Sequence, residues 1–249
     1  MFFSDLDNTL IYSHRRDIGE SKILVERLNG KEQSYMTEHA FSYFRDADWL
    51  SLVPVTTRSE TQYRRLLFPD AFHVQYALIC NGGKLLIQGE EDQEWSKETL
   101  EMVQDDLPEL ELMQGHLREL CKHEVYRAEI YYYYTKSDEP ERICDILSRK
   151  NQKKNIRIEH DHRKVYLFPQ HVNKGIAIQR FMKRYKTDVS VGAGDSIIDI
   201  PMLNEVNYPL AATAIYGSIT CPEVRQLKGI VISDQVCEEL EALHLNGII

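Results

Sequence analysis

The first ten residues constrain the fold of this chain most strongly. A short apolar run ends in two carboxylates two residues apart, Asp5 and Asp7, which are followed by Asn8 and Thr9. The apolar run predicts a buried strand, and the polar residues after it are typical of a turn. Ligands bind at the carboxyl ends of strands in open α/β sheets. The pair therefore lies where a ligand would bind, although Asp-x-Asp alone is equally consistent with a simple turn cap.

Strand and helix patterns alternate at both ends of the chain, which predicts a single parallel sheet. A hairpin is expected over residues 22–36, because Asn29-Gly30 is a strong turn dipeptide. Further strands are expected at residues 52–56, 76–80, 189–191, 208–212 and 229–232, and helices at residues 37–50, 58–68, 174–185, 198–204 and 234–245.

Charged residues are denser in the middle of the chain, from residue 84 to about 168, than in the segments on either side. Its patterns predict helices at 96–106 and 109–121, a strand at 124–134, a helix at 139–151 and a hairpin over 156–168 that turns near Asp161. Such an order predicts a separate small α/β layer. We therefore expect an α/β fold: a Rossmann-like parallel-sheet core of residues 1–83 and 169–249, and an inserted α/β cap of residues 84–168.

Charge and composition restrict the partners. The formal charge of −9 disfavours broad attraction to nucleic acid or to an anionic membrane. No apolar stretch reaches the ~20 residues that a membrane helix needs, and the start of the chain does not resemble a signal peptide. Five scattered cysteines indicate reduced thiols and a cytoplasmic location. The oligomeric state is left open.

Other polar residues follow predicted strands or begin predicted helices. Thr56 and Thr57 precede a helix, where a hydroxyl and free N–H groups can bind phosphate. Asp195 and Asp199 follow a glycine-containing turn, and Lys174 begins a helix. Carboxylate oxygens suit a hard cation such as Mg²⁺. Phosphoryl transfer needs an attacking oxygen, a metal and positive charge around the phosphoryl group, so this set predicts that chemistry.

Four segments resemble, in order, the motifs of haloacid dehalogenase superfamily phosphatases. They are residues 3–10, 55–59, 173–175 and 192–203. Residues 80–83 also resemble a loop of members with a large cap inserted between the second and third motifs. The chain is thus similar to the branch that includes Cof-type hydrolases, sucrose-phosphate phosphatase and mannosyl-3-phosphoglycerate phosphatase. The resemblance implies a phosphoric monoester hydrolase that forms an aspartyl-phosphate.

The resemblance also implies roles for single residues. Asp5 would be the nucleophile, and Asp7 would protonate the leaving alcohol and then deprotonate the attacking water. Thr56, with Thr57 beside it, would bind the phosphoryl oxygens. Lys174 would neutralise charge between Asp5 and the phosphate.

The expected cofactor is Mg²⁺. By the same resemblance it would bind Asp5, the main-chain carbonyl of Asp7 and Asp195, with Asp199 nearby through water or Lys174. The metal would offset repulsion between an anionic nucleophile and an anionic substrate.

Three residues depart from the family pattern. Asn8 replaces the usual Gly after the second Asp, but Asn tolerates the left-handed backbone, so we expect the turn to survive. Ile198 stands where Cof-type members often have Asn, which affects a contact near the metal and not the reaction class. Thr57 replaces a common Gly and adds a hydroxyl.

The cap offers further candidates. Arg127, Arg163 and Lys164 are cations that could bind a second anionic group of the substrate, or could simply be solvated. Tyr131–Tyr134 should alternate faces if it is a strand, with packing favoured over a partner or sugar contact. His160–His162 is interpreted as a polar hairpin tip that could line the cleft, rather than as a metal site.

These inferences predict a Mg²⁺-dependent phosphatase that hydrolyses a small, sugar-like phosphomonoester. The first alternative is a phosphomutase of the same superfamily, which returns the phosphoryl group to the sugar. The second is a non-catalytic protein that binds a phosphorylated metabolite, which is disfavoured because every catalytic position is filled. A nucleotide-dependent oxidoreductase is disfavoured because no Gly-x-Gly-x-x-Gly follows the first strand.

Overall fold

Strand β1 (Phe2–Ser4) lies inside the core sheet of the computed structural model, which describes all 249 residues. It pairs in parallel with β13 (Val191–Gly194) on one side and with β5 (Leu52–Pro54) on the other. The sheet continues, also in parallel, through β14 (Tyr208–Ala212) to β15 (Arg225–Leu227). The order β15-β14-β13-β1-β5 confirms the predicted parallel-sheet core.

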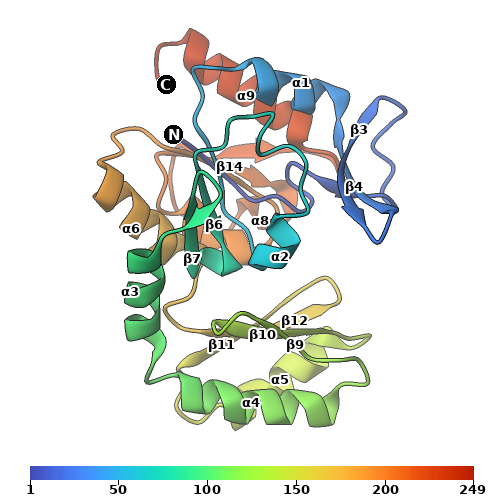
Figure 1. Cartoon of the computed structure of the whole chain (residues 1–249), viewed down its shortest axis with the longest axis vertical. Coiled ribbons are helices and arrows are strands. Elements are labelled where there is room, and N and C mark those ends of the chain that lie inside the picture. The colour runs from blue at the N-terminus through green and yellow to red at the C-terminus, as the bar shows by residue number, and fades with distance from the viewer.

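Helices cover both faces of this sheet. Adjacent residues of a strand point to opposite faces, so Phe2 stacks on Phe44 of α1 (Glu38–Asp46), whereas Phe3 meets Phe181 of α6 (Lys174–Tyr185) edge to face. Figure 1 shows α1 beside α9 on one side of the core, with α6 on another. The remaining core helices are α9 (Ser233–Leu245) and the short α7 (Ile200–Leu203) and α8 (Thr213–Tyr216).

A turn of unusual backbone geometry follows β6 (Tyr76–Ile79). Cys80, Asn81 and Gly82 all have positive φ angles, of 53°, 58° and 87°. A Cβ on Gly82 would lie 2.3 Å from the Cβ of Ala177, so this position requires glycine. After the turn, β7 (Lys84–Ile87) pairs back onto β6 and is followed by β8 (Glu90–Glu91).

The inserted segment forms a second α/β unit, which confirms the predicted fold class. Its antiparallel sheet has the order β11-β12-β10-β9, and one face of it packs on two helices. Figure 1 shows the other face turned toward the core, with α3 running from the core to this unit. Its elements are α3 (Gln93–Val103), α4 (Leu107–Leu120), β9 (Tyr126–Ala128), β10 (Tyr132–Lys136), α5 (Pro140–Lys150), β11 (Ile156–Asp161) and β12 (Lys164–Pro169).

The assignment of residues 84–168 to a cap and of residues 1–83 and 169–249 to a core stays a proposal. The cap sheet, α4 and α5 lie within the proposed cap. Strands β7 and β8 extend the core-side hairpin that begins with β6.

The predicted hairpin is present as β3 (Lys22–Leu28) and β4 (Lys31–Thr37), flanked by β2 (Tyr12–Ser13). Asn29 and Gly30 both have positive φ, as the tight hairpin turn requires. Thr37 caps α1, because its hydroxyl accepts a hydrogen bond from the main-chain N–H of Ala40 at 3.1 Å. These local features follow from local sequence.

Four predicted elements were wrong in extent. The strand expected at 189–191 is β13 (Val191–Gly194), so the glycines expected in the turn after it lie within the strand. The helix expected at 58–68 is reduced to α2 (Glu60–Tyr63), because the chain turns back and Leu67 donates a main-chain hydrogen bond to Val25. The strand expected at 124–134 is the hairpin β9–β10, which turns at Glu129 with a φ of 53°. The last strand lies at β15, before the predicted 229–232, where Gly229 has a φ of 89°.

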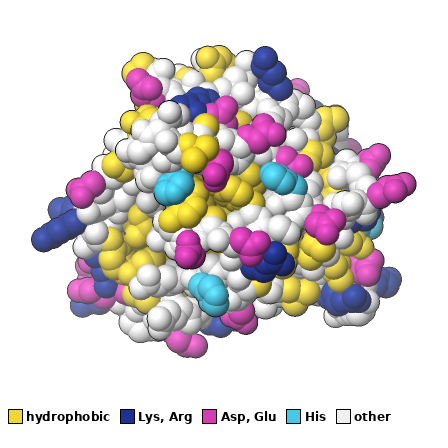
Figure 2. Space-filling view, turned by 90° about the horizontal axis from the view of Figure 1, so that it is seen from above, with side chains coloured by type: hydrophobic (Ala, Val, Ile, Leu, Met, Phe, Trp, Pro, Cys, Tyr) yellow, Lys and Arg dark blue, Asp and Glu magenta, His cyan; other side chains and the backbone are white.

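None of the helices combines the length and the apolar character needed to span a bilayer. All five cysteines are free. On the surface that carries α1 and α9, hydrophobic side chains gather between acidic and histidine side chains, and the basic side chains are dispersed (Figure 2). This face therefore lacks a basic patch of the kind that binds polyanions.

We expect Asn8→Val to destabilise the fold by about 1–3 kcal/mol, because a β-branched residue is strained at positive φ. Asn8 has a φ of 66°. Asn8→Gly should cost less than the valine variant, because glycine adopts positive φ without steric strain. Urea denaturation of the three proteins checks this. Equal midpoints for the valine variant and the wild type would contradict the strain argument.

Candidate active site

A buried lysine joins two of the predicted carboxylates. Lys174 is the first residue of α6, whose start is capped by the Asn173 side chain. Its Nζ donates to Oδ1 of Asp5 at 2.5 Å and to Oδ1 of Asp199 at 2.6 Å, and the residue is only 1% exposed. Burial alone would lower the pKa of Lys174, but the two carboxylates raise it. The lysine is therefore a fixed positive charge beside Asp5.

Three carboxylates lie close enough to hold a cation. Oxygens of Asp5, Asp195 and Asp199 lie within 4.8 Å of one another. Burial and the neighbouring carboxylates raise the pKa of Asp195 to about 9 and that of Asp5 to about 7, although Lys174 opposes the shift at Asp5. Negative charge is thus in excess here, and oxygen donors of this kind fit a hard divalent cation.

Asp199 has a different set of contacts from the other two carboxylates. Its Oδ1 binds Lys174, and its Oδ2 accepts hydrogen bonds from the main-chain N–H groups of Asp195 and Ser196 at 3.0 and 2.9 Å. A Cβ on Gly194 would lie 2.4 Å from the Cβ of Asp199, so glycine lets the turn close on it. Asp5 and Asp195 are accordingly the better placed to bind a cation directly.

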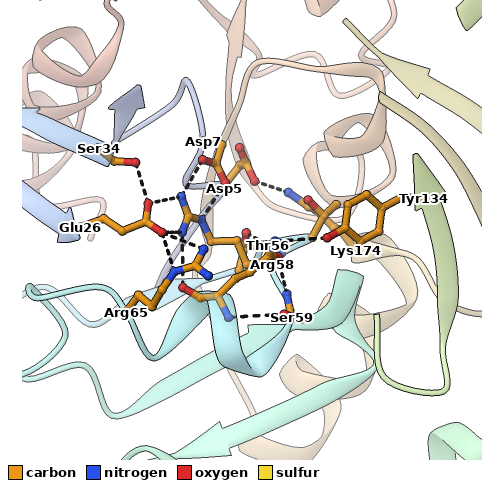
Figure 3. Close-up of polar contacts among 12 residues, drawn as sticks. Asp5, Asp7, Glu26, Ser34, Thr56, Arg58, Ser59, Arg65, Tyr134 and Lys174 are labelled. Carbon is orange, nitrogen blue, oxygen red and sulfur yellow. Dashed lines mark hydrogen bonds and ion pairs between the residues drawn. The ribbon is translucent and has the colours of Figure 1, made fainter. Parts of the chain in front are cut away.

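Asp7 is engaged by an arginine. Nε and Nη2 of Arg58 each donate to one carboxylate oxygen of Asp7 at 2.8 Å, and Arg58 also pairs with Glu26 of β3 (Figure 3). Burial would raise the pKa of Asp7, but the charge and hydrogen bonds of Arg58 outweigh it and lower the pKa to about 2. The sequence prediction gave no role to Arg58, although it lies within the second motif, and overlooked Glu26 entirely.

Thr56 and Thr57 lie at the same edge of the sheet as Asp5, because β5 is the neighbour of β1. Thr56 is fully buried, and its hydroxyl accepts a hydrogen bond from the main-chain N–H of Arg58 at 3.1 Å. The carbonyl of Thr57 accepts a hydrogen bond from the Tyr132 hydroxyl of the cap. The second motif therefore contacts both Asp7, through Arg58, and the cap, through Thr57.

One face of the cap sheet carries aromatic rings toward the core. Tyr132 and Tyr134 of β10 share this face with Tyr166 of β12, which pairs with β10 in register, and the Tyr134 hydroxyl accepts a hydrogen bond from Gln62 of α2 at 3.3 Å. Tyr133 points to the opposite face and packs with the cap helices. Tyr132–Tyr134 thus alternate as a strand pattern predicts, but Tyr131 lies in the turn before β10 and is buried in the same cluster as Tyr132.

One of the three predicted cap cations faces this site. Lys164 lies two residues before Tyr166 on β12, on the same face of the cap sheet, and the electrostatic effects of Tyr166 and Asp7 raise its pKa against the effect of burial. Arg127 instead pairs with Glu111 at 3.4 Å, and Arg163 pairs with Asp138. The cap therefore brings a single lysine toward Asp7.

The tip of the β11–β12 hairpin also faces the site. Asp161 contributes to the raised pKa of Asp195, and β11 contacts the 3₁₀ turn η2 (Ile197–Asp199). His160 and His162 are not part of the carboxylate group that could hold a metal. The hairpin therefore lies beside the 3₁₀ turn that carries Asp199.

Comparison with known proteins gives one family match and a set of similar structures. Residues 119–213 match the model of the haloacid dehalogenase-like hydrolases. This segment contains Lys174, Asp195 and Asp199 but not Asp5 or Asp7. No curated protein matches the chain at the level of sequence.

Three similar solved structures illustrate the shared fold. The sucrose-phosphatase of Synechocystis sp. PCC6803, in complex with sucrose and phosphate, is 16% identical with a TM-score of 0.65, and the match covers 98% of this chain and 96% of that one. A trehalose-6-phosphate phosphatase related protein is 14% identical, with a TM-score of 0.56 and 99% coverage of both chains. A haloalkanoate-superfamily phosphatase of Bacteroides thetaiotaomicron is 14% identical, with a TM-score of 0.55 and coverage of 100% and 95%. The family match and these similar folds confirm the predicted resemblance to the haloacid dehalogenase-like hydrolases.

We expect Lys174→Met to destabilise the fold by about 3–5 kcal/mol near neutral pH, because it leaves buried carboxylates without their counter-charge. Lys183→Met, at an exposed position of the same helix, should change the free energy of unfolding by less than about 0.5 kcal/mol. Denaturant unfolding with a chelator present measures both. Similar midpoints for the two variants would show that the Lys174 contacts contribute little.

Proposed function

We propose that this chain, which has the fold and the motif order of the haloacid dehalogenase-like hydrolases, hydrolyses a small phosphomonoester through an aspartyl-phosphate. The observation that carries the proposal is the Asp5 carboxylate, held by Lys174 at the carboxyl edge of β1. Asp7 lies two residues further along the same turn. A nucleophile, a fixed positive charge and a second carboxylate are the groups that this reaction requires.

The first step would form the aspartyl-phosphate. An oxygen of Asp5 attacks phosphorus, the bond from phosphorus to the ester oxygen breaks, and the leaving alcohol takes a proton from Asp7. Asp7 must take up that proton when the substrate binds, because Arg58 holds its pKa near 2 in the free protein. Lys174 stabilises the negative charge that spreads over the phosphoryl oxygens, and Thr56 and Thr57 at the next strand end bind those oxygens.

The second step would release phosphate. Asp7, now a carboxylate, takes a proton from water as the water oxygen attacks phosphorus, and the bond from phosphorus to Asp5 breaks. Phosphate leaves, and Asp5 returns to its original state. Closure of the cap over this edge would keep bulk water away from the site during the first step.

Magnesium is the cofactor that the donor set fits best. Asp5, Asp195 and the main-chain carbonyl of Asp7 would bind it, and Asp199 would support the site through Lys174 and the turn that it holds. When bound, the ion would reduce the repulsion between the carboxylate nucleophile and the anionic substrate. The raised pKa values of Asp5 and Asp195 are the observation that supports a cation here.

The leaving group would be sugar-like. Tyr132 and Tyr166 are buried against the core, whereas Tyr134 beside them is only partly buried. The ring and hydroxyl of Tyr134 would suit an apolar face and a polar edge of a sugar. The similar fold of a sucrose-phosphatase bound to sucrose and phosphate supports the same class. The paired state of Arg127 and Arg163 leaves Lys164 as the cap cation nearest to the site.

The first test is phosphate release from a panel of phosphorylated metabolites. We expect Asp5→Asn to reduce release by about 10³-fold or more, because an amide cannot form the acyl-phosphate. Asp188→Asn, at an exposed position, should retain wild-type rates. Full activity of Asp5→Asn would contradict the assignment of the nucleophile, and phosphate transfer back to the sugar in place of release would favour a phosphomutase.

The second test concerns the metal. We expect Mg²⁺ to raise the thermal unfolding midpoint of the wild type, because an ion that binds the folded state stabilises it. Asp195→Asn should lose most of that increase, and Asp188→Asn should keep it. A chelator should abolish phosphate release by the wild type. An equal Mg²⁺ effect on all three proteins would contradict binding at Asp195.

A further inference from the structure

We propose that Glu26, on the β3–β4 hairpin, is a positioning residue that acts through Arg58 to fix the carboxylate of Asp7. The inference rests on the proposed function, in which Asp7 moves protons. It adds to that function a connection between an otherwise peripheral hairpin and the reacting groups. Figure 3 shows the three side chains in a row, with Arg58 between the two carboxylates.

The backbone of β3 is distorted at the residue that makes this connection. The register with β4 shifts on both sides of Glu26, between Leu24 and Glu26 and between Glu26 and Arg27. Val25 and Glu26 are consequently both buried, at 0% and 3% exposure, although neighbouring strand residues normally face opposite ways. Such bulges redirect side chains and are frequent beside active sites. Here the bulge turns a carboxylate inward.

A buried carboxylate needs compensation, and Glu26 has three partners. The Ser34 hydroxyl donates to it at 2.7 Å, and Arg58 and Arg65 each lie 3.0 Å from its oxygens. With Asp7, the group contains two carboxylates and two guanidinium ions. The group carries no net charge, so burying Glu26 leaves no unpaired negative charge in the hairpin.

Arg58 is held from both sides. Nε and Nη2 bind Asp7, and Nη1 and Nη2 bind Glu26 at 3.0 Å. A planar guanidinium can serve two carboxylates in this way, whereas a lysine ammonium acts as a point charge. If Glu26 loses its charge, Asp7 is the only charged partner left to Arg58, beside a 3.4 Å contact with the carbonyl of Gln62. Arg58 can then move, and Asp7 with it.

The chain supplies a matched control in Arg65. Arg65 pairs with the same Glu26 oxygen as Arg58 does but makes no contact with Asp7. It also stands in the segment after α2 that turns back onto β3, where Leu66 forms an isolated bridge with Glu26. If Glu26 only stabilises the hairpin, Arg58 and Arg65 should matter equally. If it positions Asp7, only Arg58 should affect the reaction.

The experiment compares Glu26→Gln, Arg58→Lys, Arg65→Gln and Asp7→Asn on two substrates. One is the best sugar phosphate of the panel, whose alcohol needs a proton to leave. The other is p-nitrophenyl phosphate, whose phenolate leaves without one, followed as single-turnover phenolate release so that the first step alone is measured. Thermal unfolding of each variant identifies any that fail to fold.

We expect Glu26→Gln and Arg58→Lys to lower kcat on the sugar phosphate by about 10–100-fold, part of the 10²–10⁴-fold that a proton-transfer group contributes. KM should change by less than about threefold, and single-turnover phenolate release should fall far less than kcat. Arg65→Gln should remain within about twofold of the wild type on both substrates.

Three results would overturn the inference. In the first, Glu26→Gln and Arg58→Lys lower the rate by the same factor on both substrates. In the second, Arg65→Gln lowers kcat as much as those two variants do. In the third, Glu26→Gln and Arg58→Lys keep the wild-type kcat although Asp7→Asn does not. Full activity of Asp7→Asn on the sugar phosphate would instead remove the proposed role of Asp7, and the inference with it. Comparison of Asp7→Asn with the other variants therefore separates the two failures.

Discussion

The ion pairing of Lys174 with Asp5 and Asp199 is the interaction on which the rest of the site depends. It joins the end of β1, the start of α6 and the turn after β13, three segments far apart in sequence. A buried ammonium is costly unless carboxylates surround it, and buried carboxylates are costly without a cation. Each segment therefore constrains the other two. The same requirement leaves Asp195 with an excess of negative charge, which a divalent ion would balance.

A second network fixes the other carboxylate of the first motif. Arg58 holds Asp7 apart from Lys174, so the two aspartates of one turn are placed in different electrostatic surroundings. Asp5 faces a lysine and two carboxylates, whereas Asp7 faces a guanidinium. The pKa of Asp5 rises and that of Asp7 falls. Two chemically identical side chains are thereby held in different surroundings: Asp5 needs Lys174 and a cation to be ionised for attack, and Asp7 must take up a proton before it can act as an acid.

Much of the fold could be predicted because its signals are local. The apolar run of β1, the Asn29-Gly30 turn and the Thr37 cap each act within a few residues, and all three are present. Asn8 adopts the left-handed backbone that its residue type tolerates. The predicted site residues also come together at one sheet edge, since the carboxyl ends of parallel strands meet there.

The errors and omissions have a common cause, which is contact between distant segments. The predicted helix at 58–68 ends early because Leu66 and Leu67 pair with β3, and no helical pattern encodes a partner 40 residues away. Glu26 looks like an ordinary charged strand residue until the bulge turns it inward. The turn between β9 and β10 contains no Gly, Pro, Asn or Asp to mark it, because Glu129 adopts the positive φ there. Sequence patterns indicate which secondary structure a segment favours, but not the contact with a distant segment that changes it.

The covalent state of the protein during turnover tests most directly whether Asp5 is the nucleophile. Wild-type protein mixed with its best phosphorylated substrate, quenched in acid and digested, would be examined by mass spectrometry for a phosphoryl group. If Asp5 is the nucleophile, a phosphoryl group should appear on Asp5 within the first turnover and decay as phosphate is released. Phosphate release without any adduct, or with an adduct on another residue, would contradict it.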